Sequence, residues 1–364
     1  MHIGREQRDF IDCLRGLSIL RVVLGHLGLF WLLRPYSEFL HALLPLLFFV
    51  SGAVSFGSFL RSDNSGRFLL RRLVLIISPY YALLAVALPL GLFWQQALAY
   101  TPSMDGVLRL LLLNPKQGDL FFPIGQVWFL HALLLITVVA LPLFGLARRA
   151  PHWLWLPVII SLLLSTVQLF TNLSPSLTVL GHNSYQAWSN MGFFFFGAWY
   201  IQHHEQRWLS SLMPWLAVGA VIMAIGGLQL SGGAVGLSHH SYAPNLYYLG
   251  CSFTVLALIL ALQATLIRLF FALPRLKQFL LFTSVHAYSI FLLHSFFIFA
   301  SEYWLGLANV SSRPLHALAK VLLVLVACYL CCPLLTRFSQ WLGNRLLGLL
   351  ALPPRNAARG SEAS

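Results

Sequence analysis

Acidic side chains are scarce in this chain. Asp and Glu together number 10 among 364 residues, and charged residues of both signs make up only 9% of the sequence. Hydrophobic residues make up 59% and the mean hydropathy is +0.78, which excludes a water-soluble multidomain protein and indicates an integral membrane protein. None of the ten carboxylates lies deep in an expected span, so a carboxylate-based proton relay across the membrane is excluded as well.

Cysteine is also rare and its count is odd. All five cysteines lie in or at the edge of apolar runs, where a disulfide framework is not expected. Cys328 and Cys331 form a C-x-x-C pair, but no His or acidic residue lies beside it, which favours packing over metal or redox chemistry. We expect no metal site.

Apolar runs of about 20 residues, long enough to cross the hydrocarbon layer, predict an all-α, polytopic membrane protein with ten transmembrane helices in one bundle. The expected spans are 13–33, 39–60, 69–93, 127–147, 152–170, 188–201, 213–230, 246–271, 279–300 and 315–335. The sixth is short, which indicates a thinned bilayer, a broken helix or a span that begins earlier. We expect a cytoplasmic N-terminal segment at 1–12, one transmembrane domain at 13–350 and a disordered cytoplasmic tail at 351–364.

The basic residues set the expected orientation. With the N-terminus in the cytoplasm, sixteen of the 23 Lys and Arg residues lie inside, four lie outside and three lie within spans. An even number of spans returns the C-terminus to the cytoplasm. The net charge of +13 therefore reflects membrane anchoring, and no nucleic acid partner is expected.

The first span carries two ionisable side chains at an informative spacing. Arg15 and His26 are eleven residues apart, so on a helix they share one face and lie about 16 Å apart along the axis. Asp12 is three residues before Arg15 and can pair with it. His26 is a candidate general base because no carboxylate is near. A buried histidine that bonds a carbonyl of a neighbouring helix is the alternative.

Later segments supply further candidates. Ser51 lies among small residues that favour close helix packing, and it can also hydrogen-bond within a site. The connection RSDNSGRFLLRR is equally consistent with an inner-surface anchor and with phosphate binding by Arg71 and Arg72. Trp128 fits an interfacial aromatic belt. His294 is expected in mid-span, where it is either a site residue or a structural histidine.

Taken together, these segments resemble the bacterial membrane acyltransferase-3 family, the O-acyltransferases of surface and secreted glycans, over essentially the whole chain. The most specific element is an Arg and a His separated by ten residues, here Arg15 and His26 within IDCLRGLSILRVVLGH. Supporting elements are FFVSG at 48–52, FLLRRLVLIISPYY at 68–81, VWFL at 127–130 and YSIFLLH at 288–294.

The resemblance implies a ten-helix fold in the bacterial inner membrane, with acyl-CoA as the cytoplasmic donor substrate, acetyl-CoA above all, and no permanently bound cofactor. The acceptor is a hydroxyl of a polysaccharide or lipid-linked glycan at the outer face. Membrane lipids and other glycan-biosynthesis proteins are the remaining expected partners. The family's functional motifs carry over to Arg15, His26, Arg71, Arg72, Trp128, Tyr288 and His294. We add Asp12 to orient Arg15, Ser51 as a supporting residue, and Arg61 and Arg67 as further ligands of the CoA phosphates.

The chain departs from the family pattern at several positions. Leu75 stands where many members have a further arginine, three positions after Arg72, which weakens the case for phosphate contacts. Gln126 stands where some members have His, and Arg21 is an additional charge.

Two other functions fit the same composition. One is a transporter or flippase of a glycan or lipid-linked saccharide, suggested by the polytopic bundle and its intramembrane charge. The other is a polyprenyl-phosphate glycosyltransferase, whose need for acidic residues in an outer loop is poorly met by Glu38, Asp105 and Asp119.

Overall fold

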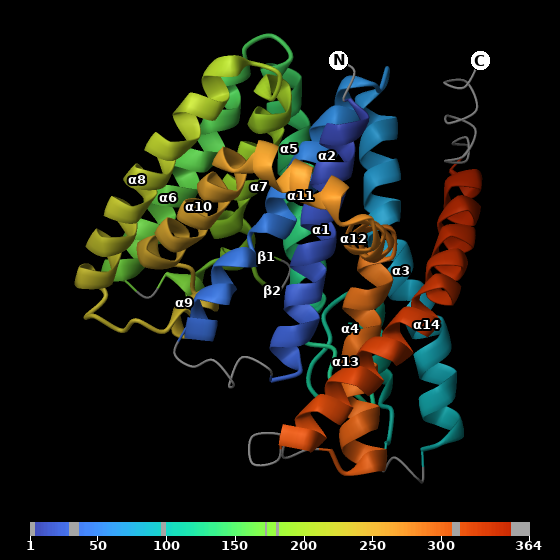
Figure 1. Cartoon of the computed structure of the whole chain (residues 1–364). Coiled ribbons are helices and arrows are strands. Elements are labelled where there is room, and N and C mark those ends of the chain that lie inside the picture. The colour runs from blue at the N-terminus through green and yellow to red at the C-terminus, as the bar shows by residue number, and fades with distance from the viewer. Residues whose placement is uncertain are drawn as a thin grey trace. The chain divides into compact units, whose positions relative to one another are not determined.

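The fold is almost entirely helical, as expected for apolar segments that must satisfy their own backbone groups in lipid (Figure 1). A computed structural model describes residues 4–28, 36–95, 100–171, 173–179, 182–307 and 314–350. The chain divides into two compact units. Unit 1 comprises Met1–Arg61 and Val138–Ala287, and unit 2 comprises Ser62–Thr137 and Tyr288–Ser364.

Unit 1 contains most of the helices and one short hairpin, in which Thr178 pairs with Asn183 and Val179 with His182. Its elements are α1 (Arg5–His26), η2 (Tyr36–Leu43), α2 (Leu46–Leu60), η3 (Pro151–Leu154), α6 (Trp155–Phe170), η4 (Ser174–Ser176), β1 (Thr178–Val179), β2 (His182–Asn183), α7 (Tyr185–His203), α8 (Arg207–Leu230), α9 (Leu237–Ser241), α10 (Leu246–Ala261), α11 (Gln263–Ala272) and α12 (Pro274–Val285), where η marks a 3₁₀ helix. Helix α5 (Val127–Ala147) contributes to both units.

Helix α7 forms the core of unit 1, since all but four of its 19 residues are buried. It begins at Tyr185 and is unbroken, so the short sixth span reflects an earlier start and not a broken helix. It packs closely on α2 through two glycines. A Cβ on Gly52 would lie 1.7 Å from the carbonyl oxygen of Phe194, and a Cβ on Gly197 would lie 2.0 Å from that of Phe49. The small residues of α2 thus have the predicted packing role.

Unit 2 is organised around two long helices, α3 (Ser65–Phe93) and α14 (Pro314–Leu349). Val74 packs with Leu347, and Gly343 lies against Ser78, so the two helices run antiparallel. The other helices of unit 2 are α4 (Met104–Leu111) and α13 (Ala287–Leu305). Helix α14 continues well beyond the predicted end at 335, because Pro333 does not end it.

The connection between α3 and α5 packs back along α3. The hydroxyls of Tyr80 and Tyr81 donate to the carbonyls of Leu110 and Leu111 over 2.8 and 2.7 Å. These bonds tie the last turn of α4 to α3. Residues 100–111 of this predicted outer connection therefore belong to the packed part of unit 2.

An ion pair closes the same connection. Arg109 makes a two-pronged contact with Asp119, with its Nε 2.9 Å from Oδ2 and its Nη2 2.5 Å from Oδ1. The backbone N–H of Lys116 donates to Oδ2 over 2.7 Å, and the hydroxyl of Tyr100 donates to the Asp119 carbonyl over 2.8 Å. The hydrogen bonds from Arg109 hold the pKa of the Asp119 carboxyl below its usual value.

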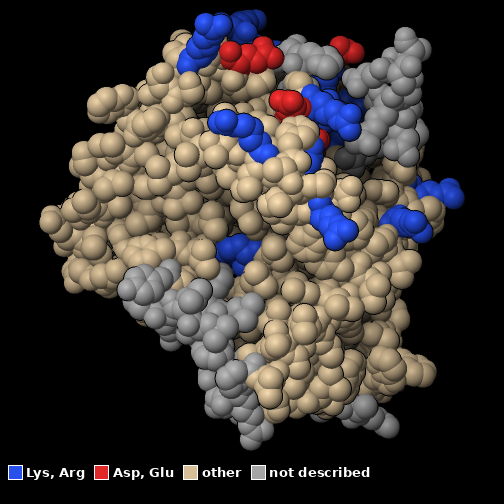
Figure 2. All heavy atoms as spheres, in the orientation of Figure 1, with Lys and Arg blue, Asp and Glu red and all other residues tan. Residues whose placement is uncertain are grey.

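Within the described residues, six helical segments are long and apolar enough to cross a membrane, or eight if two broken pairs each count as one span. The pairs are α10 with α11, bent by 65° at Leu262, and α12 with α13, which break at His286. The face drawn in Figure 2 is mostly uncharged, in keeping with a lipid environment. The chain is thus an all-α, polytopic membrane protein. A count of ten spans requires that α1 and α7 also cross the membrane. This count and the orientation of the termini remain predictions.

Candidate active site

Asp12, Arg15 and Ser284 form a closed polar group in unit 1. Nη1 of Arg15 lies 3.1 Å from Oδ1 of Asp12 and 3.4 Å from Oγ of Ser284. The Ser284 hydroxyl in turn donates to the same Asp12 oxygen over 3.2 Å. The predicted pairing of Asp12 with Arg15 is therefore present, with Ser284 as a third member. About a quarter of the Arg15 side chain (26%) stays exposed, so the guanidinium is held in place and can still be reached by an anion.

Close packing of α1 against α12 makes this group possible. A Cβ on Gly16 would lie only 2.2 Å from the carbonyl oxygen of Leu280, so glycine is needed at this crossing. Earlier in both helices, Nζ of Lys277 lies 2.6 Å from Oδ2 of Asp9. Three polar contacts and one close approach thus hold the first helix against α12.

His26 is the last residue of α1 and is exposed. Because α1 is continuous from Arg5, Arg15 and His26 keep their predicted common face, about 16 Å apart along the axis. Helical side chains lean toward the N-terminus of their helix, which carries the Arg15 guanidinium further from the imidazole. A ligand that contacts both residues must therefore span this distance.

Arg21 lies five residues before His26 on α1 and also makes contacts at this end of the helix. Nε of Arg21 donates to the carbonyl of Leu40 over 2.7 Å, and the hydroxyl of Tyr248 donates to the carbonyl of His41 over 3.2 Å. These bonds hold η2 between α1 and α10. From sequence, Arg21 was noted only as an additional charge. Its position inside an apolar run was the available indication of a role.

Ser51 is partly buried on α2, and its carbonyl accepts a hydrogen bond from the Ser55 hydroxyl over 2.6 Å. Its neighbour Gly52 makes the close approach to α7 described above. These contacts fit the structural interpretation of this segment. A supporting role for Ser51 in substrate binding remains a prediction.

In unit 2, His294 is fully buried on α13. Its Nδ1 lies 3.3 Å from the carbonyl oxygen of Ile290, so this nitrogen carries the proton and donates within the helix. Nε2 of Gln126 donates to the carbonyl of Leu292 over 3.5 Å. The residues of the late-histidine motif therefore pack against the segment that opens α5.

Trp128 and Tyr288, both partly buried, also lie in unit 2. The Trp128 ring is 6.0 Å from that of Phe129, which packs 5.2 Å from Phe291 of α13. Tyr288 directly precedes Ser289, whose hydroxyl is 2.8 Å from that of Thr336. These contacts place both aromatic residues close to helix crossings of unit 2.

The basic segment lies where α2 ends and α3 begins. The Asn64 side chain caps α3 by accepting from the backbone N–H of Arg67 over 3.0 Å. Arg67 and Arg71 are one helical turn apart and share a face, with Arg72 beside them. Arg61 and Arg67 are exposed, and Arg71 and Arg72 are partly buried. Guanidinium groups at a helix N-terminus are suited to phosphate.

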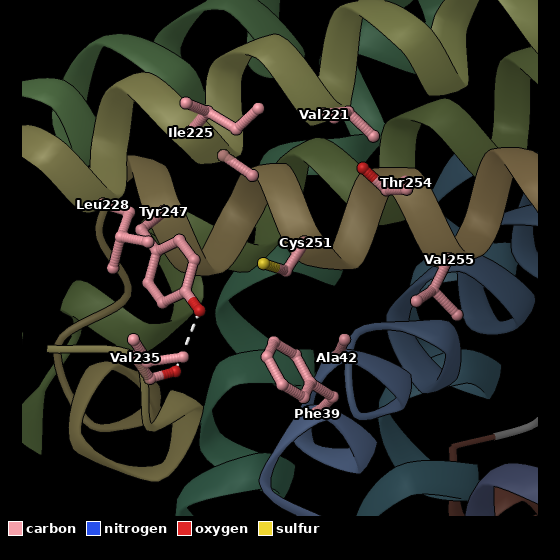
Figure 3. Close-up of a pocket in the computed structure, with 11 residues that line it drawn as sticks. Phe39, Ala42, Val221, Ile225, Leu228, Val235, Tyr247, Cys251, Thr254 and Val255 are labelled. Atoms are coloured by element: carbon pink, nitrogen blue, oxygen red, sulfur yellow. Dashed lines mark hydrogen bonds between the residues drawn. The ribbon is translucent and has the colours of Figure 1, made fainter. Parts of the chain in front are cut away.

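Unit 1 also contains an apolar cavity of about 360 Å³ between α8, α10 and η2 (Figure 3). Its lining includes Ile225, Cys251 and Val255. The two hydroxyls in its wall are engaged, Tyr247 with the carbonyl of Val235 and Thr254 with that of Gly250, both over 2.8 Å. The described residues that line it include no His, Asp, Glu, Lys or Arg.

The candidate residues divide between the two units. Unit 1 holds Asp12, Arg15, His26, Ser51 and Arg61, and unit 2 holds Arg67, Arg71, Arg72, Trp128, Tyr288 and His294. Within unit 1, Asp12 and Arg15 are in contact and His26 lies further along the same helix face. In the described part of the chain, no group of three or more His, Cys, Asp or Glu residues could hold a metal ion.

The fold is that of a polytopic membrane protein, and its first helix presents a fixed cation and an imidazole. Residues 8–337, nearly the whole chain, match the model of the acyltransferase domain of the acyltransferase-3 family. The chain belongs to this family and is a membrane acyltransferase, which confirms the predicted resemblance and disfavours the transporter and glycosyltransferase alternatives. No curated protein and no solved structure matches it.

Proposed function

We propose that this acyltransferase moves an acyl group, acetyl above all, from cytoplasmic acyl-CoA to a hydroxyl of an exopolysaccharide or other cell-surface glycan outside the inner membrane. One observation carries the proposal. Arg15 is held by Asp12 and Ser284, and His26 lies three turns further along the same helix face. Arg15 is a fixed cation and His26 can accept a proton, and the two lie at different depths. This arrangement suits acyl-CoA that enters from the cytoplasmic side and a glycan hydroxyl that arrives from the outer side.

The donor's phosphates are assigned to the basic segment. Arg61, Arg67, Arg71 and Arg72 lie around the start of α3, and guanidinium groups bind phosphate oxygens in a two-pronged geometry. Because the contacts are electrostatic, the KM for acyl-CoA should rise with ionic strength.

The chemistry is assigned to His26. Its imidazole accepts the proton of the acceptor hydroxyl while the hydroxyl oxygen attacks the thioester carbonyl and forms the new C–O bond. The carbonyl electron pair moves to oxygen. When the carbonyl re-forms, the C–S bond breaks, and the leaving thiolate takes the proton from the imidazolium. The products are an ester and free CoA thiol.

The test uses His26→Ala and Arg15→Ala, with His152→Ala and Arg149→Ala as matched controls at exposed positions of the 148–152 region. Each variant is expressed in a deletion strain, and folding is confirmed by its yield and melting temperature in detergent. Loss of a general base should lower the rate by about 10²–10⁴-fold. Loss of a charged hydrogen bond to the donor should cost about 10–100-fold in kcat/KM.

The readouts are thiol release from acyl-CoA and mass spectrometry of the surface polysaccharide. We expect ester mass to disappear from the glycan with His26→Ala and to persist in both controls. Wild-type acylation by folded His26→Ala and Arg15→Ala proteins would contradict the assignment. A glycan that is unchanged in the deletion strain would instead contradict the proposed acceptor.

A further inference from the structure

The cavity between α8, α10 and η2 is large and its wall is mostly apolar (Figure 3). Its volume of about 360 Å³ is more than twice the roughly 150 Å³ at which an apolar cavity in a protein already binds benzene. A buried water molecule needs about two to four polar partners. The two hydroxyls in the wall, those of Tyr247 and Thr254, already donate to backbone carbonyls. The cavity therefore suits a hydrocarbon group better than water.

This cavity is not sealed from the surroundings of the protein. Four of the residues that line it are 41–54% exposed, namely Phe39, Val221, Ile225 and Val235. Helix α8, and α10 together with α11, are segments that are long and apolar enough to cross a membrane. At that depth the surrounding medium consists of lipid acyl chains. The cavity therefore opens toward hydrocarbon that can enter it.

The length of the cavity is close to that of one lipid chain within its leaflet. Along α10 the lining runs from Tyr247 to Val255, which are eight residues or about 12 Å apart along the axis. One leaflet contributes about 15 Å to a hydrocarbon core of about 30 Å. Tyr247 lies in the first turn of α10 and Val255 lies near its middle. The cavity thus extends from the end of the span toward its centre, as a lipid chain does.

We propose that this cavity binds one acyl chain of a bilayer phospholipid, whose headgroup stays outside near the start of α10. A phospholipid is the occupant because the cavity opens toward the bilayer and the described residues of its wall carry no charge that would bind a headgroup or a sugar.

The bound chain packs against η2, which also contacts the first helix. Phe39 and Ala42 are three residues apart, one turn of a 3₁₀ helix, and both line the cavity. Between them, the carbonyl of Leu40 accepts the hydrogen bond from Arg21 of α1. An occupied cavity therefore supports η2 from the side opposite α1, and an emptied or filled cavity changes that support.

The test fills the cavity with Val255→Phe and uses Val218→Phe as the matched control. Val218 is exposed on α8 and does not line the cavity, so the same enlargement there meets lipid. Each purified protein is placed in nanodiscs of phosphatidylethanolamine and phosphatidylglycerol. The nanodiscs include a phosphatidylethanolamine with a photoactivatable group midway along one acyl chain, and cross-links are mapped by peptide mass spectrometry. We expect cross-links at Cys251 and Thr254 in the wild type and in Val218→Phe. Val255→Phe should lose them and keep those at Leu330, an exposed residue of α14.

Wild-type protein that cross-links at Leu330 but not at Cys251 or Thr254 would overturn the proposal, and so would a folded Val255→Phe protein that keeps the cavity cross-links. Should Val255→Phe not fold, Ala42→Leu fills the cavity from η2 and is judged by the same criterion. The lipids retained by the purified wild type are also identified by mass spectrometry. Retention of a polyprenyl-linked saccharide in place of phospholipid would refute the choice of occupant. No readout depends on acyl transfer, so this proposal and the proposed function can fail separately.

Discussion

Replacing Gly52 with alanine should force α2 and α7 apart. The new Cβ would lie 1.7 Å from the Phe194 carbonyl oxygen, where ordinary contact begins at 3.4 Å, so the helices must separate by about 1.7 Å at this crossing. Overpacking of a core usually costs about 1–3 kcal/mol. Because the obstacle is backbone and cannot rotate away, we expect a cost near 3 kcal/mol, or a melting temperature lower by about 6–12 °C.

Gly219→Ala and Gly145→Ala are the matched controls. Both glycines lie inside helices, but a Cβ at either position would meet nothing within 4 Å. These substitutions should leave the melting temperature unchanged or raise it, since glycine inside a helix costs about 0.5–1 kcal/mol relative to alanine. Thermal unfolding of detergent-purified protein, followed by tryptophan fluorescence, measures all three. A Gly52→Ala protein as stable as Gly219→Ala would refute the close crossing of α2 and α7.

Two further predictions concern ion pairs of unit 2. The lowered pKa of Asp119 means that its ionised form stabilises the fold fully above the unfolded pKa of about 3.9, and that this contribution is lost as the pH falls through the folded pKa. The melting temperature of the wild type should therefore fall more steeply below pH 4 than that of Asp119→Asn, with Asp105→Asn behaving like wild type. Lys320 is buried and Glu302 is partly exposed, with Nζ 2.5 Å from Oε1, so Glu302→Gln should cost about 1–3 kcal/mol in thermal unfolding because it leaves the buried ammonium without its charged partner. The double variant with Lys320→Met should recover most of that loss, and an equally unstable double variant would contradict the ion pair.

The sequence predicted helices best where an apolar run has clear polar ends. Helix α5 has the predicted bounds of 127–147. Helix α1 begins at Arg5, before its apolar run, because Gln7 and Phe10 are buried and extend the packed face toward the N-terminus. The breaks at Leu262 and His286 could not be predicted, because no proline or glycine marks either position inside its apolar run.

The sequence predicted only those features of the candidate site that lie within a single helix. The common face of Arg15 and His26 follows from helical periodicity, and so does the pairing of Arg15 with Asp12. Ser284 was missed because it is 269 residues from Arg15, and nothing in the sequence sets the contact of α1 with α12. The link between Tyr248 and η2 was missed for the same reason, since it joins residues 207 apart.

These long-range contacts explain how so charged a helix fits the fold. Helix α1 is not among the segments apolar enough to cross a membrane alone, and its charges need partners from other helices. Lys277 and Ser284 of α12 meet Asp9, Asp12 and Arg15, and η2 meets Arg21. The contacts that make these charges tolerable in lipid also orient Arg15 and Arg21 relative to the helix that carries His26. The residues proposed for chemistry are therefore held by the same interactions that stabilise the fold, and variants of those partners should change activity and stability together.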